Sequence, residues 1–318
     1  MNSNQWGLLI ILSLFWGGSF FFIEIALRDF QPFTLVFLRI SIAALILVGV
    51  VYFSGKRLPT SLKTWKGYFV LGLLNNAIPF TLIVWGQTRI EGGVASILNA
   101  TTPIFTVLLA HFLTADERLT LPKIMGVLVG FIGVYLMMKP ELSEGFSWRG
   151  MGQAAVLVAA TSYAFAGIFG KRFKNIPATV NSAGMLLCSS MVMLPPVLII
   201  DAPWTVRPSF EALTAVLGIA LISTVAAYLL YFYLLAAVGA TNVLLVTFLI
   251  PVSALVLGVG VLKEVIKIVE YAGMGCIFLG LIITDGRMLG WLQQAKVKKR
   301  VVRTGLADSG QHRLESLD

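Results

Sequence analysis

The stretch Gly93-Val-Ala-Ser-Ile-Leu-Asn-Ala-Thr-Thr-Pro103-Ile-Phe-Thr-Val-Leu-Leu-Ala110 returns in weakened form as Ala240-Thr-Asn-Val-Leu-Leu-Val-Thr-Phe-Leu-Ile-Pro251-Val-Ser-Ala-Leu-Val-Leu257. Each copy is an apolar segment with one proline, and the two prolines lie 148 positions apart. Further matches occur at a spacing of 147, namely Trp16 with Tyr163, Glu117 with Glu264, Gly126 with Gly273 and Gly133 with Gly280. The pattern predicts an internal duplication; convergence of unrelated apolar segments is the alternative.

The composition indicates a membrane protein. Hydrophobic residues make up 58% of the 318 residues, charged residues make up 12%, and the mean hydropathy is +0.88. A soluble domain is roughly 45–50% apolar and about 25% charged. The apolar runs have the length of about twenty residues that a spanning α-helix needs, and they lack the alternation of a membrane β-barrel. We therefore expect an all-α integral membrane protein.

Charged residues and prolines divide the chain into ten expected transmembrane helices. They cover residues 6–27, 33–53, 66–86, 94–113, 121–138, 150–170, 179–200, 210–236, 242–262 and 266–284. We assign residues 1–140 to a first five-helix repeat and 141–286 to a second. Residues 287–318 form a basic tail, which we expect to be cytoplasmic and disordered.

The distribution of Lys and Arg predicts the topology. Roughly twice as many of them fall in the connections on the N-terminal side, which places both ends of the chain in the cytoplasm of a bacterial inner membrane. Because each half holds an odd number of helices, the second half must be inverted relative to the first. Inverted repeats are typical of secondary transporters, whose substrate site lies between the halves near the bilayer midplane. The net charge of +9 owes much to the segment 296–303, which fits anionic lipid headgroups better than a nucleic acid.

Polar side chains inside apolar helices are the candidate substrate-binding residues, because such groups cost free energy in lipid unless they face a cavity or another helix. In the helix 66–86, one face carries Asn76, Phe80 and Gln87, with Asn75 and Trp85 close beside it. Hydrogen bonding across the bundle is the alternative use of these amides.

The two proline-containing helices supply further candidates. Pro103 removes a main-chain donor and clashes with the carbonyl of Asn99, so we expect a bend there, with Thr102 nearby and a similar bend at Pro251. A freed carbonyl could bind a solute group. The alternative is a bend that serves packing only, with its carbonyl satisfied by threonine hydroxyls.

Aromatic side chains complete the candidate cavity. Trp16, Phe20, Tyr163, Tyr228 and Tyr231 lie in the helices 6–27, 150–170 and 210–236. Aromatic faces with a polar tip suit planar or amphipathic solutes, although packing and interfacial belts are their commoner uses. Trp16 and Tyr163 stand above the rest because they occupy matching repeat positions.

Two charged residues are candidates for coupling or gating. Glu24 and Arg39 fall in the first two helices, and we place both nearer the outer ends, where the side chains can extend to the interface. A mutual ion pair, or proton coupling through Glu24, is the sharper hypothesis. The small-residue ridge Gly126-x-x-x-Gly130 favours close packing within the chain over a homodimer.

No catalytic or cofactor-binding motif is present. HExxH, GxxxxGK[ST] and GxSxG are all missing, and His111 and His312 are the only two histidines. Cys188 and Cys276 lie in apolar runs without metal-ligand spacing. We expect no enzyme activity, no cofactor and no metal site.

The chain resembles the EamA-type transporters of the drug/metabolite transporter superfamily. The resemblance covers nearly the whole chain to about Gly286 and rests on WGGSFFFIEIAL (16–27), FTLVFLRISIAAL (33–45), NNAIPFTLIVWGQ (75–87), GGVASILNATTPIFTVLLA (92–110), DERLT (116–120) and GVLVGFIGVYL (126–136), in that order. The resemblance implies a ten-helix inverted-repeat fold, a central cavity, and export or exchange of small metabolites by alternating access. The second half departs from the pattern, with Tyr163 in place of Trp16 and LKEVIK in place of DERLT.

These observations predict a secondary transporter for a small amino-acid-like or drug-like metabolite, with the lipid bilayer as its other partner. A passive channel, and a receptor or assembly subunit without transport, are the alternatives. A channel would need a continuous polar lining or a ring of charges.

Overall fold

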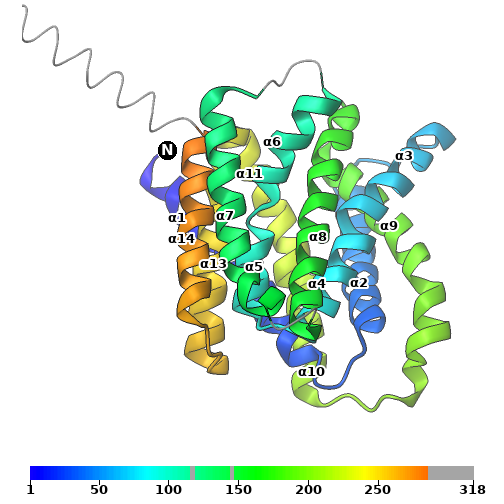
Figure 1. Cartoon of the computed structure of the whole chain (residues 1–318). Helices are drawn as coiled ribbons and strands as arrows, with labels where there is room; N and C mark the ends of the chain where they lie inside the picture. Colours follow the sequence, from blue (N-terminus) through cyan, green and yellow to red (C-terminus); the bar gives the residue numbers. More distant parts are fainter. Residues whose placement is uncertain (115–118, 144–146, 286–318) are drawn as a thin grey trace, which may run out of the picture.

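A computed structural model of the protein describes residues 1–114, 119–143 and 147–285. Within these ranges every regular element is a helix, and the elements form a bundle of ten apolar helices in two repeats, as expected (Figure 1). Eight of the ten are long and apolar enough to cross a membrane, and Val246–Leu262 and Ile268–Thr284 are shorter apolar helices. The basic tail and the loop that contains Glu117 lie outside the described residues.

The first repeat is built from α1 (Ser3–Ala26), α2 (Pro32–Phe53), α3 (Leu62–Gly72), η1 (Leu73–Ala77), α4 (Ile78–Gln87), α5 (Gly92–Asn99), α6 (Thr102–Leu113) and α7 (Leu121–Ser143). The second is built from α8 (Trp148–Gly170), η2 (Lys171–Phe173), α9 (Ala178–Pro196), η3 (Val197–Asp201), η4 (Pro203–Thr205), α10 (Phe210–Ala220), η5 (Leu221–Ala226), α11 (Ala227–Val238), α12 (Ala240–Val243), α13 (Val246–Leu257), η6 (Gly258–Leu262) and α14 (Ile268–Asp285). Several of these short pieces are consecutive parts of one spanning helix, such as α3, η1 and α4.

Helix pairing follows the duplication. The fifth helix of each repeat packs against its equivalent, α7 against α14, and the second helices pair likewise, α2 against α9. The contact of α1 with α13 has its repeat equivalent in the contact of α8 with α6. The repeats are therefore joined through several pairs of helices.

The glycine ridge serves packing within the chain, as preferred from the sequence. A Cβ atom added at Gly133 would lie 2.6 Å from the carbonyl oxygen of Gly273, and one added at Gly280 would lie 2.6 Å from the carbonyl oxygen of Gly126. Each glycine thus sits against the backbone of the opposite helix. Such close approach lets α7 and α14 gain dispersion contacts without a side chain between them.

Two π-helical segments interrupt equivalent helices. The segment η1 lies in the third helix of the first repeat, and η5 lies in the third helix of the second. A π-helical turn shifts the register of the side chains that follow it, and such turns occur frequently at functional sites. Both segments carry polar residues: Asn75 and Asn76 in η1, Ser223 and Thr224 in η5.

The fourth helix of each repeat is also broken, but not at equivalent points. In the first repeat α5 ends at Asn99 and α6 begins at Thr102, so that Pro103 stands in the first turn of α6. In the second repeat the interruption falls at residues 244–245, and Pro251 lies inside the continuous helix α13. The bend expected near Pro103 coincides with the break between α5 and α6, whereas the interruption in the second repeat lies before Pro251, and the bend expected at Pro251 itself stays a prediction.

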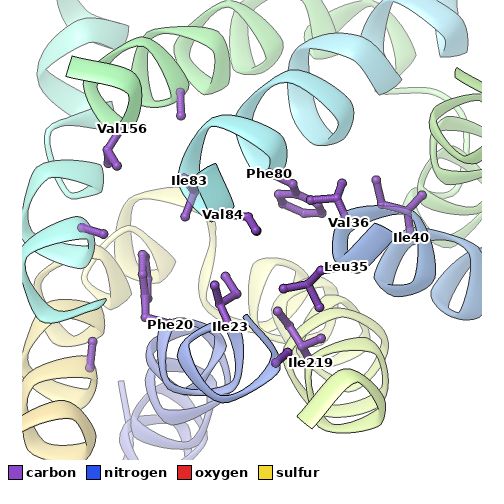
Figure 2. Close-up of a cluster of buried hydrophobic side chains, with 14 of the residues drawn as sticks. Phe20, Ile23, Leu35, Val36, Ile40, Phe80, Ile83, Val84, Val156 and Ile219 are labelled. Carbon is purple, nitrogen blue, oxygen red and sulfur yellow. The ribbon is translucent and has the colours of Figure 1, made fainter. Parts of the chain in front are cut away.

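The main hydrophobic core lies where α1, α2, α4 and α10 meet. Phe20, Ile23, Leu35, Phe80 and Ile219 are all buried there and are seen together in Figure 2. Since α10 belongs to the second repeat and the other three helices to the first, this core also joins the repeats.

Candidate functional site

Arg39 is buried in the middle of the bundle, with 6% of its surface exposed. Its Nε atom donates a 3.0 Å hydrogen bond to Oγ1 of Thr224 on η5, and its guanidinium lies 3.8 Å from the centroid of the Phe80 ring. The expectation that this side chain extends to the membrane interface is therefore wrong. An arginine at the centre of a spanning helix costs about 2.5–3.5 kcal/mol, so the position calls for a functional reason.

No carboxylate among the described residues forms an ion pair with Arg39, so the expected pairing with Glu24 does not occur. The ionisable groups that interact with it electrostatically are the hydroxyls of Tyr163 and Tyr228. Its two terminal nitrogens have no hydrogen-bond partner within the described ranges, and neither is sealed from solvent. The outer edge of the guanidinium is thus free to bind a ligand.

An amide and hydroxyl cluster lies next to this guanidinium. The Asn75 amide donates to the Tyr228 hydroxyl at 3.4 Å, and that hydroxyl donates to the amide oxygen of Asn76 at 3.3 Å. The Asn76 amide also donates to the Ser189 hydroxyl at 3.3 Å. Because Asn75 and Asn76 belong to the first repeat and Tyr228 and Ser189 to the second, the cluster bridges the two.

We define the central site as Arg39, Asn75, Asn76, Phe80, Tyr163, Thr224 and Tyr228. Phe80 and Tyr163 pack edge to face with their ring centroids 6.5 Å apart, which places an aromatic wall beside the guanidinium. The site combines one positive charge, several hydrogen-bonding groups and an apolar wall. That combination suits a small amphipathic solute with a polar end.

A second polar group of residues lies toward the end of the bundle opposite the N-terminus. The Gln87 amide donates to the carbonyl oxygen of Phe20 at 3.0 Å, and within the described part of the chain its side-chain oxygen is buried without a partner. Oε2 of Glu24 is likewise buried and unpartnered among the described residues, and the charges that act on this side chain come mainly from Glu264 and Glu91. Burial of an unpaired carboxylate is costly unless a proton or a cation neutralises it.

Glu264 connects the two repeats at this end. Its carboxylate accepts hydrogen bonds from the backbone N–H groups of Gly92, at 3.1 Å, and Gly93, at 2.9 Å, which begin α5. A carboxylate at a helix N-terminus satisfies free donors and complements the helix dipole. Burial nevertheless raises the pKa of Glu264 above its ordinary value, and the two backbone hydrogen bonds only partly offset that effect.

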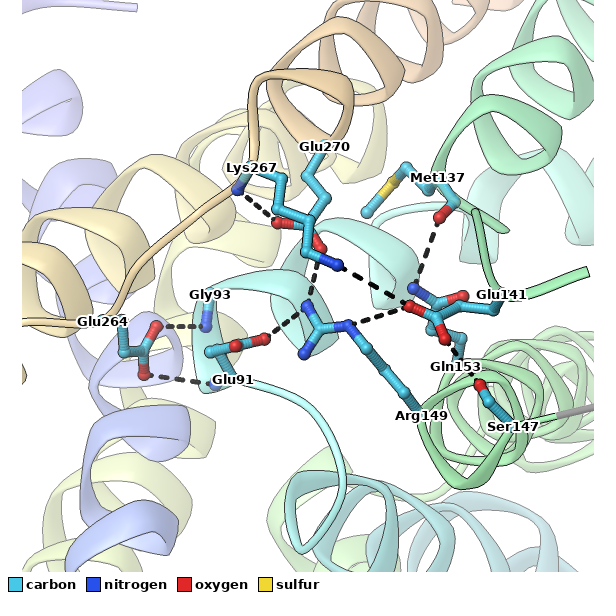
Figure 3. A network of polar contacts seen from close by, with 11 residues as sticks. Glu91, Gly93, Met137, Glu141, Ser147, Arg149, Gln153, Glu264, Lys267 and Glu270 are labelled. Atoms are coloured by element: carbon cyan, nitrogen blue, oxygen red, sulfur yellow. Dashed lines mark hydrogen bonds and ion pairs between the residues drawn. The ribbon is translucent and has the colours of Figure 1, made fainter. Parts of the chain in front are cut away.

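Arg149 lies at the centre of an ion-pair network at the same end (Figure 3). Its Nη2 atom is 2.7 Å from Glu270 and 2.6 Å from Glu91, and its Nε atom is 3.3 Å from Glu141. The Glu91 contact is an ion pair without hydrogen-bond alignment. Lys267 adds a longer contact to Glu141, at 3.9 Å. These charges connect the ends of α7, α8 and α14 with the residues that precede α5 and α14.

Other sequence candidates lie apart from the central site. Trp16 packs against Tyr231 at 5.4 Å between ring centroids, in a separate core cluster with α13. Trp85 lies near Arg89, whose guanidinium is 5.8 Å from the ring centroid.

The residues around the break in the fourth helix are satisfied locally. The Thr102 hydroxyl donates to the carbonyl oxygen of Asn99 at 2.8 Å, and Thr106 donates to the carbonyl oxygen of Thr102 at 2.8 Å. The carbonyl that Pro103 frees is therefore occupied by a threonine hydroxyl, in line with the packing alternative. The side-chain oxygen of Asn99 is buried with no partner in the ranges that the structure describes, and it stays a candidate for binding a ligand.

Sequence reasoning missed Thr224, Ser189 and Arg149 as members of these clusters. Thr224 and Ser189 are short hydroxyl side chains within apolar helices, and such residues commonly bond to their own helix. The available signal for Thr224 was its position in the repeat, because it falls in the segment equivalent to the one that holds Asn75 and Asn76.

Comparison with known proteins gives a consistent result. The sequence profile of the EamA-like transporter family matches residues 5–139 and again residues 150–284. The uncharacterized transporter YoaV of Bacillus subtilis (strain 168) is 26% identical over 86% of this chain and 94% of its own length. The uncharacterized inner membrane transporter YedA of Escherichia coli (strain K12) is 25% identical over 89% of this chain and 91% of its own. One solved crystal structure superposes on this chain with a TM-score of 0.63 and 17% sequence identity. The superposition covers 89% of this chain and 98% of the crystallised one, and it shows a similarity of fold alone.

Proposed function

The chain belongs to the EamA-like transporter family, and we propose that it is a secondary active transporter that exports or exchanges a small metabolite by alternating access. Its expected setting is a bacterial inner membrane with both termini in the cytoplasm. An inverted repeat supports this mechanism, because rocking of one half against the other exposes a site between them to either side.

The observation that carries the proposal is that the central site lies near the middle of the membrane-spanning helices and is formed by residues of both repeats. Asn76 lies near the middle of the 26-residue span Leu62–Gln87, and Thr224 lies near the middle of the 29-residue span Phe210–Val238. Polar groups at that depth are unfavourable in lipid and mark substrate pathways. Because both repeats contribute to the site, relative motion of the repeats would rearrange it.

Carboxylates join the repeats at the end of the bundle opposite the N-terminus. Asp201 accepts hydrogen bonds from the backbone N–H of Thr34 at 2.6 Å and from its hydroxyl at 2.9 Å. Asp29 accepts from the backbone N–H of Ser209 at 2.7 Å, and Glu264 binds the start of α5. Each contact crosses from one repeat to the other. Opening of this end would have to break them, which makes them candidate elements of an outer gate.

Glu24 is the proposed coupling group. Its Oε2 atom is buried without a partner among the described residues, and Glu264 and Glu91 repel the charged carboxylate, whereas Gln87 and Arg28 favour it. Uptake of a proton would relieve the burial of charge and the repulsion. A proton gradient could then bias the outer gate. Replacement of Glu24 by Gln is expected to abolish dependence of transport on a pH gradient while counterflow is retained. Unchanged dependence would reject the coupling role.

The transport proposal is tested in two steps. Metabolite profiles of the medium around overexpressing and deletion cells identify the exported compound. Counterflow of that labelled compound in proteoliposomes then separates a carrier from a pore, because only a carrier shows saturable counterflow. Replacement of Asn76 by Ala should reduce counterflow at least about tenfold, whereas replacement of the exposed Asn175 by Ala should leave it unchanged. Linear, unsaturable flux, or equal flux in both variants, would contradict the proposal.

A further inference from the structure

We infer that the ligand of the central site is an organic anion, a carboxylate with an apolar body, whose carboxylate binds the terminal nitrogens of Arg39. This inference rests on the proposed function for its biological meaning, although binding can be measured without transport.

The charge of the site is positive and uncompensated among the described residues. Arg39 donates through Nε to Thr224 and stacks on Phe80, and these contacts leave the edge that carries the two terminal nitrogens without a partner. A guanidinium presents this edge as a planar fork that matches a carboxylate with two parallel hydrogen bonds. A buried cation without a counter-ion is therefore prepared for an anionic ligand.

The neighbours of Arg39 discriminate against a cationic group. The ionisable side chains that act on it are Tyr163 and Tyr228, both of which are neutral at physiological pH, and no Asp or Glu of the described chain does so. An ammonium group would be repelled by the guanidinium and would find no carboxylate to pair with. The partly buried ring of Tyr163, which packs edge to face against buried Phe80, instead offers an apolar surface to the rest of the ligand.

The asymmetry of the repeats limits the site to one such charge. The position 147 residues after Arg39 is Leu186, which is fully buried in α9. The duplicated scaffold thus supplies one guanidinium and an apolar residue at the equivalent position. One carboxylate per site follows from this arrangement, with the remainder of the ligand on the apolar side.

The test compares four probes that share one phenyl ring and a similar chain: 3-phenylpropionate, 3-phenylpropan-1-ol, 3-phenylpropylamine and phenylalanine. Binding to the purified full-length protein is measured from intrinsic tryptophan fluorescence and from thermal stabilisation. We expect 3-phenylpropionate to bind at least about tenfold more tightly than the alcohol and the amine. Phenylalanine should bind more weakly than 3-phenylpropionate, because its ammonium group has no partner.

Two arginine variants test whether the preference for the anion depends on Arg39 or on any arginine that stacks on an aromatic ring. The Arg39→Gln variant should lose the preference for 3-phenylpropionate. Arg172→Gln is the matched control, because Arg172 also stacks on a ring, that of Phe169 at 4.5 Å, but is exposed, and it should keep the preference.

Chemical modification of the unaltered protein covers the case in which Arg39→Gln fails to fold. Phenylglyoxal should modify Arg39, as read by peptide mass spectrometry, and 3-phenylpropionate but not 3-phenylpropylamine should protect it. Equal affinities for the four probes, no measurable binding of the anion, or modification of Arg39 that the anion does not slow would each overturn the inference. Loss of counterflow for every compound, with anion binding intact, would instead contradict the proposed transport function.

Discussion

The packing of α7 against α14 makes a sharp prediction for Gly280. An ideal Cβ atom at this position would lie 2.6 Å from both the carbonyl oxygen of Gly126 and the backbone nitrogen of Gly130, and 2.9 Å from the Cα atom of Gly130. All three atoms are backbone, so no side chain can rotate away. Replacement of Gly280 by Ala must therefore push the two helices apart.

The size of the effect follows from these distances. Ordinary van der Waals contact begins at 3.4 Å, so the helices must separate locally by about 0.8 Å. Overpacking of this kind typically destabilises a protein by about 1–3 kcal/mol. The higher helix propensity of Ala relative to Gly offsets up to about 1 kcal/mol of this cost. We expect Gly280→Ala to lower the free energy of unfolding by about 1–2 kcal/mol.

Gly275 provides a control on the same helix. It is exposed, and nothing lies within 4 Å of an added Cβ, so Gly275→Ala should stabilise the protein by about 0.5–1 kcal/mol. Unfolding of both variants by sodium dodecyl sulfate in mixed micelles, followed by tryptophan fluorescence, gives the two free energies. Equal stability of Gly280→Ala and Gly275→Ala would contradict close backbone packing of α7 against α14 at Gly280.

Three further predictions concern the charged end of the bundle. Hydrogen bonds from Ser209 lower the pKa of Asp29. The stability that Asp29 contributes is therefore present above its ordinary pKa of 3.8 and is lost as the pH falls through the lowered pKa. The Asp29→Asn variant should show a flatter dependence of thermal stability on pH below about pH 4. Burial raises the pKa of Glu264. The stability that Glu264 contributes is therefore present below its ordinary pKa of 4.5 and is lost as the pH rises through the raised pKa. The Glu264→Gln variant should show a flatter dependence of thermal stability on pH above about pH 4.5. Arg149→Met should lower the free energy of unfolding by about 2 kcal/mol in the same denaturation assay, because it leaves partly buried carboxylates unpaired.

Much of the scaffold could be predicted from the sequence, because its signals are local or repeated. Apolar runs of spanning length identify the ten helices, and Gly126 and Gly133 match Gly273 and Gly280 at one fixed spacing. The face of the third helix was also predicted in part: Asn76, Phe80 and Gln87 are all buried. Asn76 and Gln87 nevertheless lie about 16 Å apart along the helix, with Asn76 in the central site and Gln87 toward the end of the bundle.

The placement of Arg39 could not be predicted, because it depends on residues far away in the chain. Thr224, which accepts its hydrogen bond, is 185 residues distant, and the distance along the helix from its start suggested an interfacial position. Composition and periodicity report how apolar a helix is, and neither reports which side chain from another helix meets it. The interruption at residues 244–245 also escaped prediction, because these two residues are both leucine and no proline or glycine marks the position.

Symmetry of the backbone and asymmetry of the side chains have different consequences for function. Two inverted repeats can exchange their conformations, which gives inward-open and outward-open states of similar energy. Side chains that differ between the repeats then shift the balance. Arg39 corresponds to Leu186 and Asn76 to Ser223 at the repeat spacing of 147, so the charge and the amide of the central site both come from the first repeat. A ligand held by these groups would bind the two states unequally, and a ligand shifts a conformational equilibrium only through such a difference in affinity. In the proposed mechanism the duplicated scaffold would support the motion, and the residues that differ between the repeats would determine which ligand drives it.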